Sequence, residues 1–439
     1  MDKVDSKTHC FPGFASYFGG MKFISILWII CLTVLLQHCS LRKDISSSTD
    51  HASSCSAPQS CFYEVQLTRT LVLDSLAHPW SIAFISDQEA FITEKDGQLL
   101  KVDLLQKTKT PIAGFPVDLF TPDTIRPENY PPLTYPTSVA GLAISGNAGI
   151  LDVVLHPDYQ HNQLIYLSYV AKREDTFALK VIRAKVENNS LTNIQTLLNP
   201  GPYVPGLWHF GGGLCIYDNY IYVTAGERLF FEGLQEGLPI AQDVSDARGS
   251  IYRLNLDGTI PTDNPTFGPN AVPGTYAIGI RAAQGITHRP GTDEIWFSEH
   301  GTIQGDELNL LKPGANYGWP NVTSGKWRTV DYQPDSLPNP DYTSPVHYWL
   351  QTVAPTGLVF YTGTDFPHWQ GDLIVPGLSR GSLWRMKVNG QRIISAEELF
   401  LGAHLRSRKV AQSPGGTLYQ LTDEKNGKLL QISNQPFNQ

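Results

Sequence analysis

His209 is the residue whose type and setting point most directly to chemistry. It precedes three glycines and an apolar run within residues 207–228, LWHFGGGLCIYDNYIYVTAGER. Other polar residues adjoin apolar segments in a similar way: Asn147, Arg281, the Glu299-His300-Gly301 turn, Ser379-Arg380, and Arg406 with Arg408. A neutral imidazole can accept a proton, and several cations around it suit a planar ligand with several negative charges. We predict that these residues gather around such a ligand.

Each of these residues also has a purely structural interpretation. His209 could cap its turn in a wet channel, and Arg281 could pair with a carboxylate of its own sheet. Arg406 and Arg408 project from one face of a strand, because side chains two positions apart share a face. Buried together they would repel each other, so they require an anionic ligand or several carboxylates nearby.

The stretch GDELNLLKPGANYGWP, residues 305–320, is different in kind. Asp306 and Glu307 lie beside a glycine turn, and Asn316 with Tyr317 follows in a second turn. Carboxylate and main-chain oxygens of this kind are the hard ligands that Ca²⁺ prefers. Two solvated turn carboxylates would give the same spacing, so both interpretations remain open.

An internal repeat defines the elements that must position these residues. Six segments share an apolar pair, a polar turn, an apolar strand, and a second turn with another apolar strand. They are residues 80–104, 150–173, 211–258, 285–314, 356–390 and 410–433. This pattern predicts an all-β fold, a six-bladed β-propeller with four-stranded blades and long loops on one face.

The first strand pattern, residues 62–73, is expected to complete the last blade and close the ring without an exposed edge. The polar residues named above should stand just before the strands that line the channel. Long loops rich in Pro, Gly and aromatic residues are predicted on one face, where propellers carry their sites. They span residues 120–145, 200–212, 229–248, 262–284, 300–306 and 320–356.

Composition and the N-terminal segment indicate which partners and which compartment to expect. The 33 Lys and Arg against 41 Asp and Glu give a net charge of -8, with no basic run, so a nucleic-acid partner is not expected. Residues 21–40, MKFISILWIICLTVLLQHCS, contain an apolar run of signal-peptide length and predict secretion to the periplasm. Cys39 weakly matches a lipoprotein cleavage site, so a lipid anchor stays open.

Residues 1–60 are therefore interpreted as an N-terminal extension with a signal and a Ser-rich tether, and residues 61–435 as the propeller domain. Cys55 and Cys61 could form a disulfide in an oxidising compartment. Cys215 lies in an apolar strand and is predicted to be a buried thiol.

Seven successive motifs resemble the glucose/sorbosone dehydrogenase family, whose members are soluble quinoprotein aldose dehydrogenases that use pyrroloquinoline quinone (PQQ) and Ca²⁺. The motifs run in order along residues 70–432: HPWSIAF, GILDVVLHPDY, HFGGGL, AQDVSDARGSIYRLNLDGTIPTDNP, GIRAAQG, EHGTIQGDELNLLKPGANYGWP and PVHYWLQTVAPTGLVFYTG. The resemblance implies oxidation of an aldose sugar at its anomeric carbon to a lactone, with electrons passed to an external acceptor.

The resemblance also implies a role for each matching residue. His209 would be the general base, and hydride would pass to C5 of PQQ. Arg281, Arg406 and Arg408, with Asn147, would bind PQQ, and the three glycines after Phe210 would let the flat cofactor approach the backbone. Main-chain carbonyls of Gly301 and Thr302 would hold the catalytic Ca²⁺. Three further positions have implied roles, a second Ca²⁺ site at Glu307 and Tyr317 and a sugar contact at Asp306.

Five positions depart from the family pattern. Asn147 replaces Gln, Ala282 replaces Asn, Ser379 replaces Lys, Lys409 replaces Asp and Thr302 replaces Pro. The first three losses, at about 1 to 1.5 kcal/mol each, are expected to weaken PQQ binding by about two to three powers of ten unless something compensates. Lys409 adds a positive charge, but strand alternation predicts that it points away from both arginines.

Two other functions are compatible with the sequence. The propeller could keep Ca²⁺ but have lost PQQ and act as a binding module, which Ala282 and Ser379 favour and His209 and Arg281 oppose. A Ca²⁺-dependent lactonase on a similar propeller is the weaker alternative, because the ordered motifs are those of the dehydrogenases.

Overall fold

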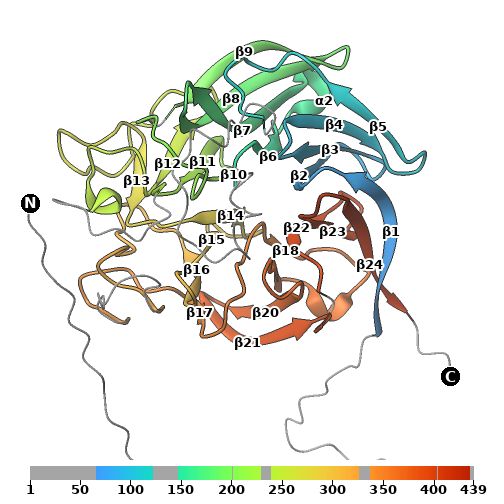
Figure 1. The fold of residues 1–439 in the computed structure, drawn as a ribbon. Helices are drawn as coiled ribbons and strands as arrows, with labels where there is room; N and C mark the ends of the chain where they lie inside the picture. Colours follow the sequence, from blue (N-terminus) through green and yellow to red (C-terminus); the bar gives the residue numbers. More distant parts are fainter. Residues whose placement is uncertain are drawn as a thin grey trace, which may run out of the picture. The chain divides into compact units, whose positions relative to one another are not determined.

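The computed structural model describes residues 66–121, 147–199, 201–228, 239–325, 337–402 and 404–435. All of them belong to one compact unit, Glu64–Gln439. They form six four-stranded antiparallel sheets, which stand as blades around a common centre (Figure 1). The predicted all-β six-bladed propeller is therefore confirmed. The N-terminal signal, Cys39, Cys55 and Cys61 lie outside the described residues.

The blades follow the chain order, and each begins with its innermost strand. Blade 1 contains β2 (Pro79–Phe84), β3 (Glu89–Glu94), β4 (Gln98–Asp103) and β5 (Thr108–Ile112). Blade 2 contains β6 (Ile150–Leu155), β7 (Leu164–Arg173), β8 (Thr176–Glu187) and β9 (Ser190–Leu198). Blade 3 contains β10 (Gly211–Tyr217), β11 (Tyr220–Ala225), β12 (Ser250–Asn255) and β13 (Thr275–Ile278).

The remaining blades complete the ring. Blade 4 contains β14 (Ala283–His288), β15 (Ile295–Glu299), β16 (Asp306–Leu310) and β17 (His347–Trp349). Blade 5 contains β18 (Val359–Phe360), β19 (Leu373–Pro376), β20 (Leu383–Asn389) and β21 (Arg392–Leu399). Blade 6 contains β22 (Ser407–Gln412), β23 (Leu418–Thr422), β24 (Gly427–Gln435) and β1 (Gln66–Leu76).

The described helices are short: α2 (Tyr159–Asn162), η3 (Ile240–Gln242) and η4 (Pro367–Trp369). Within the described ranges, none is long and apolar enough to cross a membrane.

The ring closes through its first strand, as the sequence predicts. β1 pairs antiparallel with β24 as the outer strand of the last blade, with Gln66 opposite Gln435. The innermost strands β2, β6, β10, β14, β18 and β22 each contact the next around the ring, and β22 contacts β2 (Figure 1). The N-terminal strand thus holds the last blade to the start of the chain.

The apolar core lies between neighbouring blades. Phe91 of blade 1 packs with Ile165 of blade 2, and Trp296 of blade 4 packs with Leu373 of blade 5. A strand between two neighbours is buried on both faces, so β15 begins with three consecutive apolar residues and every residue in it is buried. This packing fixes the blades against one another and so positions the ends of their strands.

The start of each inner strand lies beside the end of the second strand in its blade. Gly211 pairs with Ala225, Ala283 with Glu299, and Ser407 is opposite Thr422. Residues just before the inner strands and just after the second strands therefore meet at one edge, which we call the channel edge. It carries His78, Lys95, Asn147, His209, Glu227, Arg281, His300, Arg406 and Asp423.

Two predicted positions are wrong. The Glu299-His300-Gly301 turn does not precede the inner strand of blade 4 but lies at the end of its second strand, β15. Ser379 and Arg380 do not precede the inner strand of blade 5 but follow its second strand, β19. The Arg380 guanidinium makes hydrogen bonds of 2.7 and 3.1 Å to the carboxylate of Glu398 on the outer strand β21. The Arg380 guanidinium is therefore paired with a carboxylate of its own blade.

Candidate active site

His209 is held by a carboxylate on the neighbouring strand end. Its Nδ1 lies 2.8 Å from Oε1 of Glu227, which follows β11, and both side chains are buried. An ionised carboxylate can only accept hydrogen bonds, so Nδ1 is the donor and the lone pair of the neutral ring lies on Nε2. This is the tautomer that a general base needs. Glu227 was not singled out from the sequence.

His209 adopts a left-handed backbone conformation, with φ of 52°. Such a conformation is uncommon for a residue with a side chain and is held in place by its surroundings. Arg228 makes contacts that hold this segment. Its Nε donates to the Trp208 carbonyl at 2.9 Å and its Nη2 to the Gly206 carbonyl at 2.6 Å. Its guanidinium also stacks 3.5 Å from the Phe210 ring centroid.

The three glycines after Phe210 are required by the packing of the protein itself. A Cβ on Gly211 would lie 2.7 Å from the Thr224 carbonyl oxygen, and one on Gly212 would lie 2.4 Å from a Leu151 methyl. At Gly213 the nearest neighbours are also protein atoms. The glycines are needed because β10 packs tightly among neighbouring strands, and their role toward a flat cofactor stays a prediction.

Arg281 is buried directly before β14. Its Nη1 donates to the His300 carbonyl at 3.2 Å, and its guanidinium lies 5.1 Å from the Trp319 ring centroid. Its backbone N–H donates to the carboxylate of Glu299. The Arg281 carbonyl accepts from the Glu227 backbone N–H at 2.9 Å, which connects it with the strand end that holds His209. The structure therefore brings His209 and Arg281 to adjacent positions on the channel edge.

Arg406, Arg408 and a lysine converge on a single buried carboxylate, Asp423. The Lys95 ammonium lies 2.7 Å from Oδ1 of Asp423, and Arg406 Nη2 lies 3.6 Å from Oδ2. Arg408 Nη2 donates to the same oxygen. His78 Nδ1 lies 3.5 Å from Oδ1. The sequence required an anion near the two arginines, and the structure supplies one carboxylate together with a third cation.

The electrostatics of this cluster are dominated by positive charge. Burial alone would raise the pKa of the Asp423 carboxyl, but Arg408 and Lys95 hold it well below its ordinary value. Arg408 Nη1 donates to Gln284 Oε1 at 2.6 Å, and its guanidinium lies 4.2 Å from the Trp80 ring centroid. Arg408 Nε is buried without a hydrogen-bond partner among the described residues.

Two carboxylates, buried Glu299 and half-buried Glu307, face each other across β15 and β16. Glu299 and Glu307 are register partners, and they line a small cavity together with Gly301 and Tyr317. Burial and the neighbouring Glu307 raise the pKa of Glu299 to about 8, and burial raises that of Glu307 to about 7. In the described part of the chain, no group of three or more His, Cys, Asp or Glu side chains forms a metal site. A cation here would therefore need backbone carbonyl ligands as well.

Asp306 is buried and makes three hydrogen bonds to backbone amides. Its Oδ1 accepts from Gly301 N at 2.8 Å, and its Oδ2 accepts from Val353 N and Ala354 N, both at 2.7 Å. It thus ties the Gly301–Thr302 turn to the segment after β17. In this conformation the carboxylate is directed at these amides.

The positions that depart from the family pattern lie at or near the channel edge. Asn147 donates its backbone N–H to the Leu207 carbonyl at 2.9 Å, two residues before His209. Ala282 is fully buried, and Ser379 is exposed, with its N–H 3.1 Å from the Val353 carbonyl. The three side chains contribute no charge.

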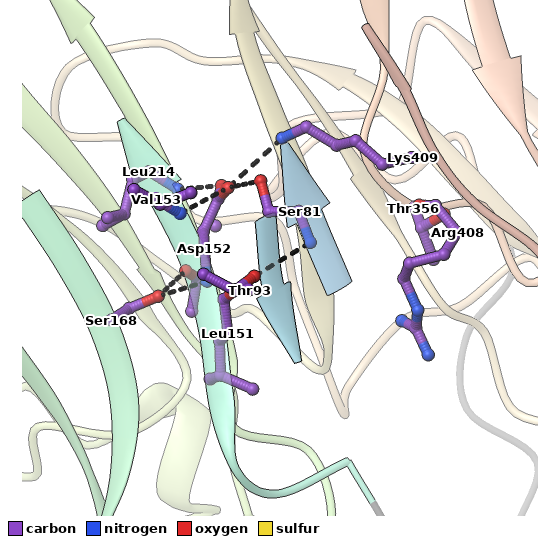
Figure 2. A network of polar contacts seen from close by, with 12 residues as sticks. Ser81, Thr93, Leu151, Asp152, Val153, Ser168, Leu214, Thr356, Arg408 and Lys409 are labelled. Carbon is purple, nitrogen blue, oxygen red and sulfur yellow. Dashed lines mark hydrogen bonds and ion pairs between the residues drawn. The ribbon is translucent and has the colours of Figure 1, made fainter. Parts of the chain in front are cut away.

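Lys409 points away from the arginines, as strand alternation predicts. Its Nζ lies 3.3 Å from Oδ1 of Asp152 on β6, on the other side of the channel. Figure 2 shows its side chain extending away from the Arg408 guanidinium and toward Asp152, which also accepts from Ser81. Lys409 is therefore paired inside the channel and adds no cation to the cluster around Asp423.

His78, which precedes β2, escaped the sequence interpretation, and so did three further channel-edge residues: Lys95, Glu227 and Asp423. Each of these three follows the second strand of its repeat, in TEK, AGE and LTD. A charged residue that recurs at that position was the available signal. It is visible only after the inner and second strands of each repeat have been aligned.

Comparison with known proteins agrees with this geometry. A sequence model of the family described as Glucose / Sorbosone dehydrogenase matches residues 76–431. This chain belongs to the glucose/sorbosone dehydrogenase family. Family membership supports an oxidoreductase that acts on a small sugar.

Relatives of this chain include proteins named as aldose sugar dehydrogenases. Aldose sugar dehydrogenase YliI of Escherichia coli is 31% identical over 373 residues, which cover 82% of this chain and 91% of the relative. A crystal structure of the soluble aldose sugar dehydrogenase from Escherichia coli, in the apo-form, has a TM-score of 0.72 and 29% identity, covering 84% of this chain and all of that one. The PQQ-bound aldose sugar dehydrogenase of Streptomyces coelicolor shares the fold, with a TM-score of 0.64 and 21% identity over 84% of this chain and 99% of that one.

Proposed function

We propose that this chain oxidises aldose sugars at the anomeric carbon to lactones, with PQQ and Ca²⁺ as cofactors and an external electron acceptor. One observation carries the proposal. The buried His209–Glu227 pair lies at the same channel edge as Arg281 and as a group of cations that outnumber the carboxylate they share. A proton acceptor beside an excess of positive charge suits deprotonation of a substrate next to an anionic cofactor.

The residues present fit PQQ, which is a flat quinone with several carboxylates. Lys95, Arg406 and Arg408 share Asp423, so a bound carboxylate would balance charge that the protein leaves unbalanced. The unpartnered Nε of Arg408 is a further sign that the cluster is incomplete without a ligand. Arg406 and Arg408 would hold the carboxylates, Arg281 would hold a quinone oxygen, and Asn147 would contribute an amide.

The mechanism follows from what these side chains do. When bound, PQQ would supply the hydride acceptor. His209 Nε2 would take the proton of the anomeric hydroxyl, and Glu227 would stabilise the resulting imidazolium through its hydrogen bond to Nδ1. The fixed charge of Arg281 would stabilise negative charge on the quinone oxygen it holds. The sugar contact at Asp306 stays a prediction.

The acidic pair fits Ca²⁺ by its donor chemistry. Two neighbouring carboxylates in register, shielded from most solvent, repel each other unless they are protonated or share a cation. Hard oxygen ligands from Glu307 and the Tyr317 main chain, and carbonyls of the turn at Gly301 and Thr302, are what Ca²⁺ prefers. We assign Glu307 and Tyr317 to a structural ion and Gly301 and Thr302 to a catalytic one.

Adding Ca²⁺ to metal-free protein is expected to raise the free energy of unfolding, by about 2.7 kcal/mol at a hundredfold excess over Kd. Glu307→Gln should lose most of this gain, because the amide keeps the shape of the side chain but removes the charge. Glu294→Gln is the matched control, since Glu294 pairs with Arg289 at the opposite end of β15. Denaturant titrations with and without Ca²⁺ measure the difference. An unchanged Ca²⁺ response in the Glu307 variant would exclude it as a ligand.

Reconstitution tests the function itself. PQQ and Ca²⁺ are added to the purified apo-protein, and quinone absorbance and dye reduction are recorded with a panel of aldoses. We expect both a bound-cofactor spectrum and sugar-dependent dye reduction. The absence of both at micromolar PQQ would overturn the proposal. It would favour the second candidate function, a propeller that binds a ligand without redox chemistry, to which buried Ala282 and exposed Ser379 point.

The proposed location is the periplasm, with Cys39 as a possible site of lipid attachment. This rests on the apolar segment of residues 21–40, which lies outside the described residues.

A further inference from the structure

Lys95 joins the first blade to the last at the channel edge. It follows β3, and its side chain is only 6% exposed. Its ammonium lies 2.7 Å from the carboxylate of Asp423, which follows β23 in blade 6. The sequence analysis gave this lysine no role, and the mechanism proposed above does not use it.

The charges around Asp423 do not balance. Its carboxylate is the common ion-pair partner of Lys95, Arg406 and Arg408, and the side chains of Asp423 and Arg408 are each only 1% exposed. One negative charge thus serves three positive ones, and His78 is also nearby. An excess of buried positive charge is unfavourable unless an anion or water reaches it. Arg406, at 40% exposure, shows that the cluster opens toward solvent on one side.

Neither Ser379 nor Lys409 brings a further cation to the cluster around Asp423. Ser379 is uncharged, and it lies on blade 5. Lys409 is paired with Asp152 inside the channel (Figure 2). Lys95 is therefore the lysine that the structure places in the same cluster as both arginines.

We propose that Lys95 is a ligand-binding residue, which acts with Arg406 and Arg408 to bind a carboxylate of the anionic cofactor. The positive charge of Lys95 offsets part of the loss of PQQ affinity that the sequence predicts from Ser379. This inference rests on the proposed function for the identity of the ligand, but its geometric basis, three cations on one carboxylate, is independent of it.

A purely structural role for Lys95 predicts something different. If the lysine only neutralised Asp423, its removal would lower stability and leave ligand affinity unchanged. Arg408 already donates to Asp423 and keeps that carboxylate paired without Lys95. The two roles can therefore be separated by measuring stability and PQQ affinity on the same variants.

The experiment is a titration of the Ca²⁺-loaded full chain with PQQ, followed by quinone absorbance and by quenching of tryptophan fluorescence. Lys95→Met should weaken PQQ binding by about tenfold, the usual effect of one charge-assisted hydrogen bond. Lys95→Arg should restore most of the affinity. Lys409→Met is the matched control, because it also removes a buried lysine–carboxylate pair but one that points away from the cluster. It should lower stability and leave PQQ affinity unchanged.

Lys95→Gln is a second neutral variant that can still donate to Asp423, and it serves if the Met variant does not fold. Equal PQQ affinities of the wild type and the neutral variants would overturn this inference alone. Failure of the wild type to bind PQQ at all would overturn the proposed function and this inference with it. Weaker binding in the neutral variants, with normal binding in the Lys409 control, would establish the role of Lys95.

Discussion

Replacing His209 by alanine is expected to lower kcat for aldose oxidation by about a hundredfold to ten-thousandfold, while PQQ remains bound. In the proposed mechanism the imidazole is the proton acceptor, and the Glu227 carboxylate holds it in the right tautomer. Without it the anomeric hydroxyl must lose its proton to water, whereas the cations that hold the cofactor remain in place. Steady-state dye reduction gives kcat, and the quinone absorbance reports cofactor occupancy in the same sample.

The control is His288→Ala, at the opposite end of β14 from Arg281. This imidazole stacks on Tyr217 and hydrogen-bonds to the Thr292 carbonyl, so its loss should leave kcat unchanged. Unchanged kcat in the His209 variant would contradict the assignment of the base. Loss of PQQ binding in that variant would instead assign His209 to the cofactor. Glu227→Gln should give a smaller loss of kcat, because the imidazole stays but its orientation and its cation lose their partner.

The fold could be predicted because most blades are built from strands that follow one another in the sequence. Two strands joined by a polar turn recur along the chain, and burial between blades gives strands such as β15 a run of consecutive apolar residues. Blade 5 is the instructive failure. Its inner strand contains only Val359 and Phe360, so the pattern gave no clear start, and Ser379-Arg380 was assigned to the wrong strand end.

The candidate site could be predicted only in part, for a related reason. A residue's position before a strand is local information, and it placed His209, Arg281 and Arg406 on the channel edge. The partner of a side chain is not local. Lys95 meets Asp423 only because the ring closes between blades 1 and 6, and no spacing in the sequence encodes that contact. Strand alternation did predict the direction of Lys409, since that property depends on its immediate neighbours.

Asp423→Asn is expected to lower the free energy of unfolding by about 3 to 5 kcal/mol, because it leaves buried cations without their carboxylate. Lys95 and Arg408 would then face each other without an anion between them. Urea denaturation at neutral pH measures the loss. Asp365→Asn is the control: that carboxylate is exposed, and its removal should change stability by no more than about 0.5 kcal/mol.

The free energy of unfolding should depend on pH differently in the wild type and in the Asp423→Asn variant. The pKa of Asp423 is held well below its ordinary value of 3.8, so in the wild type its contribution is present above that value and is lost as the pH falls through the lower folded-state pKa. The Asn variant lacks this group, so its stability should fall less steeply on acidification. PQQ should stabilise the Asn variant more than the wild type, because a ligand carboxylate then replaces the missing charge. If the Asn variant were as stable as the wild type at neutral pH, the cations would not depend on Asp423. That result would contradict the excess of positive charge around Asp423, on which both the proposed cofactor site and the role of Lys95 rest.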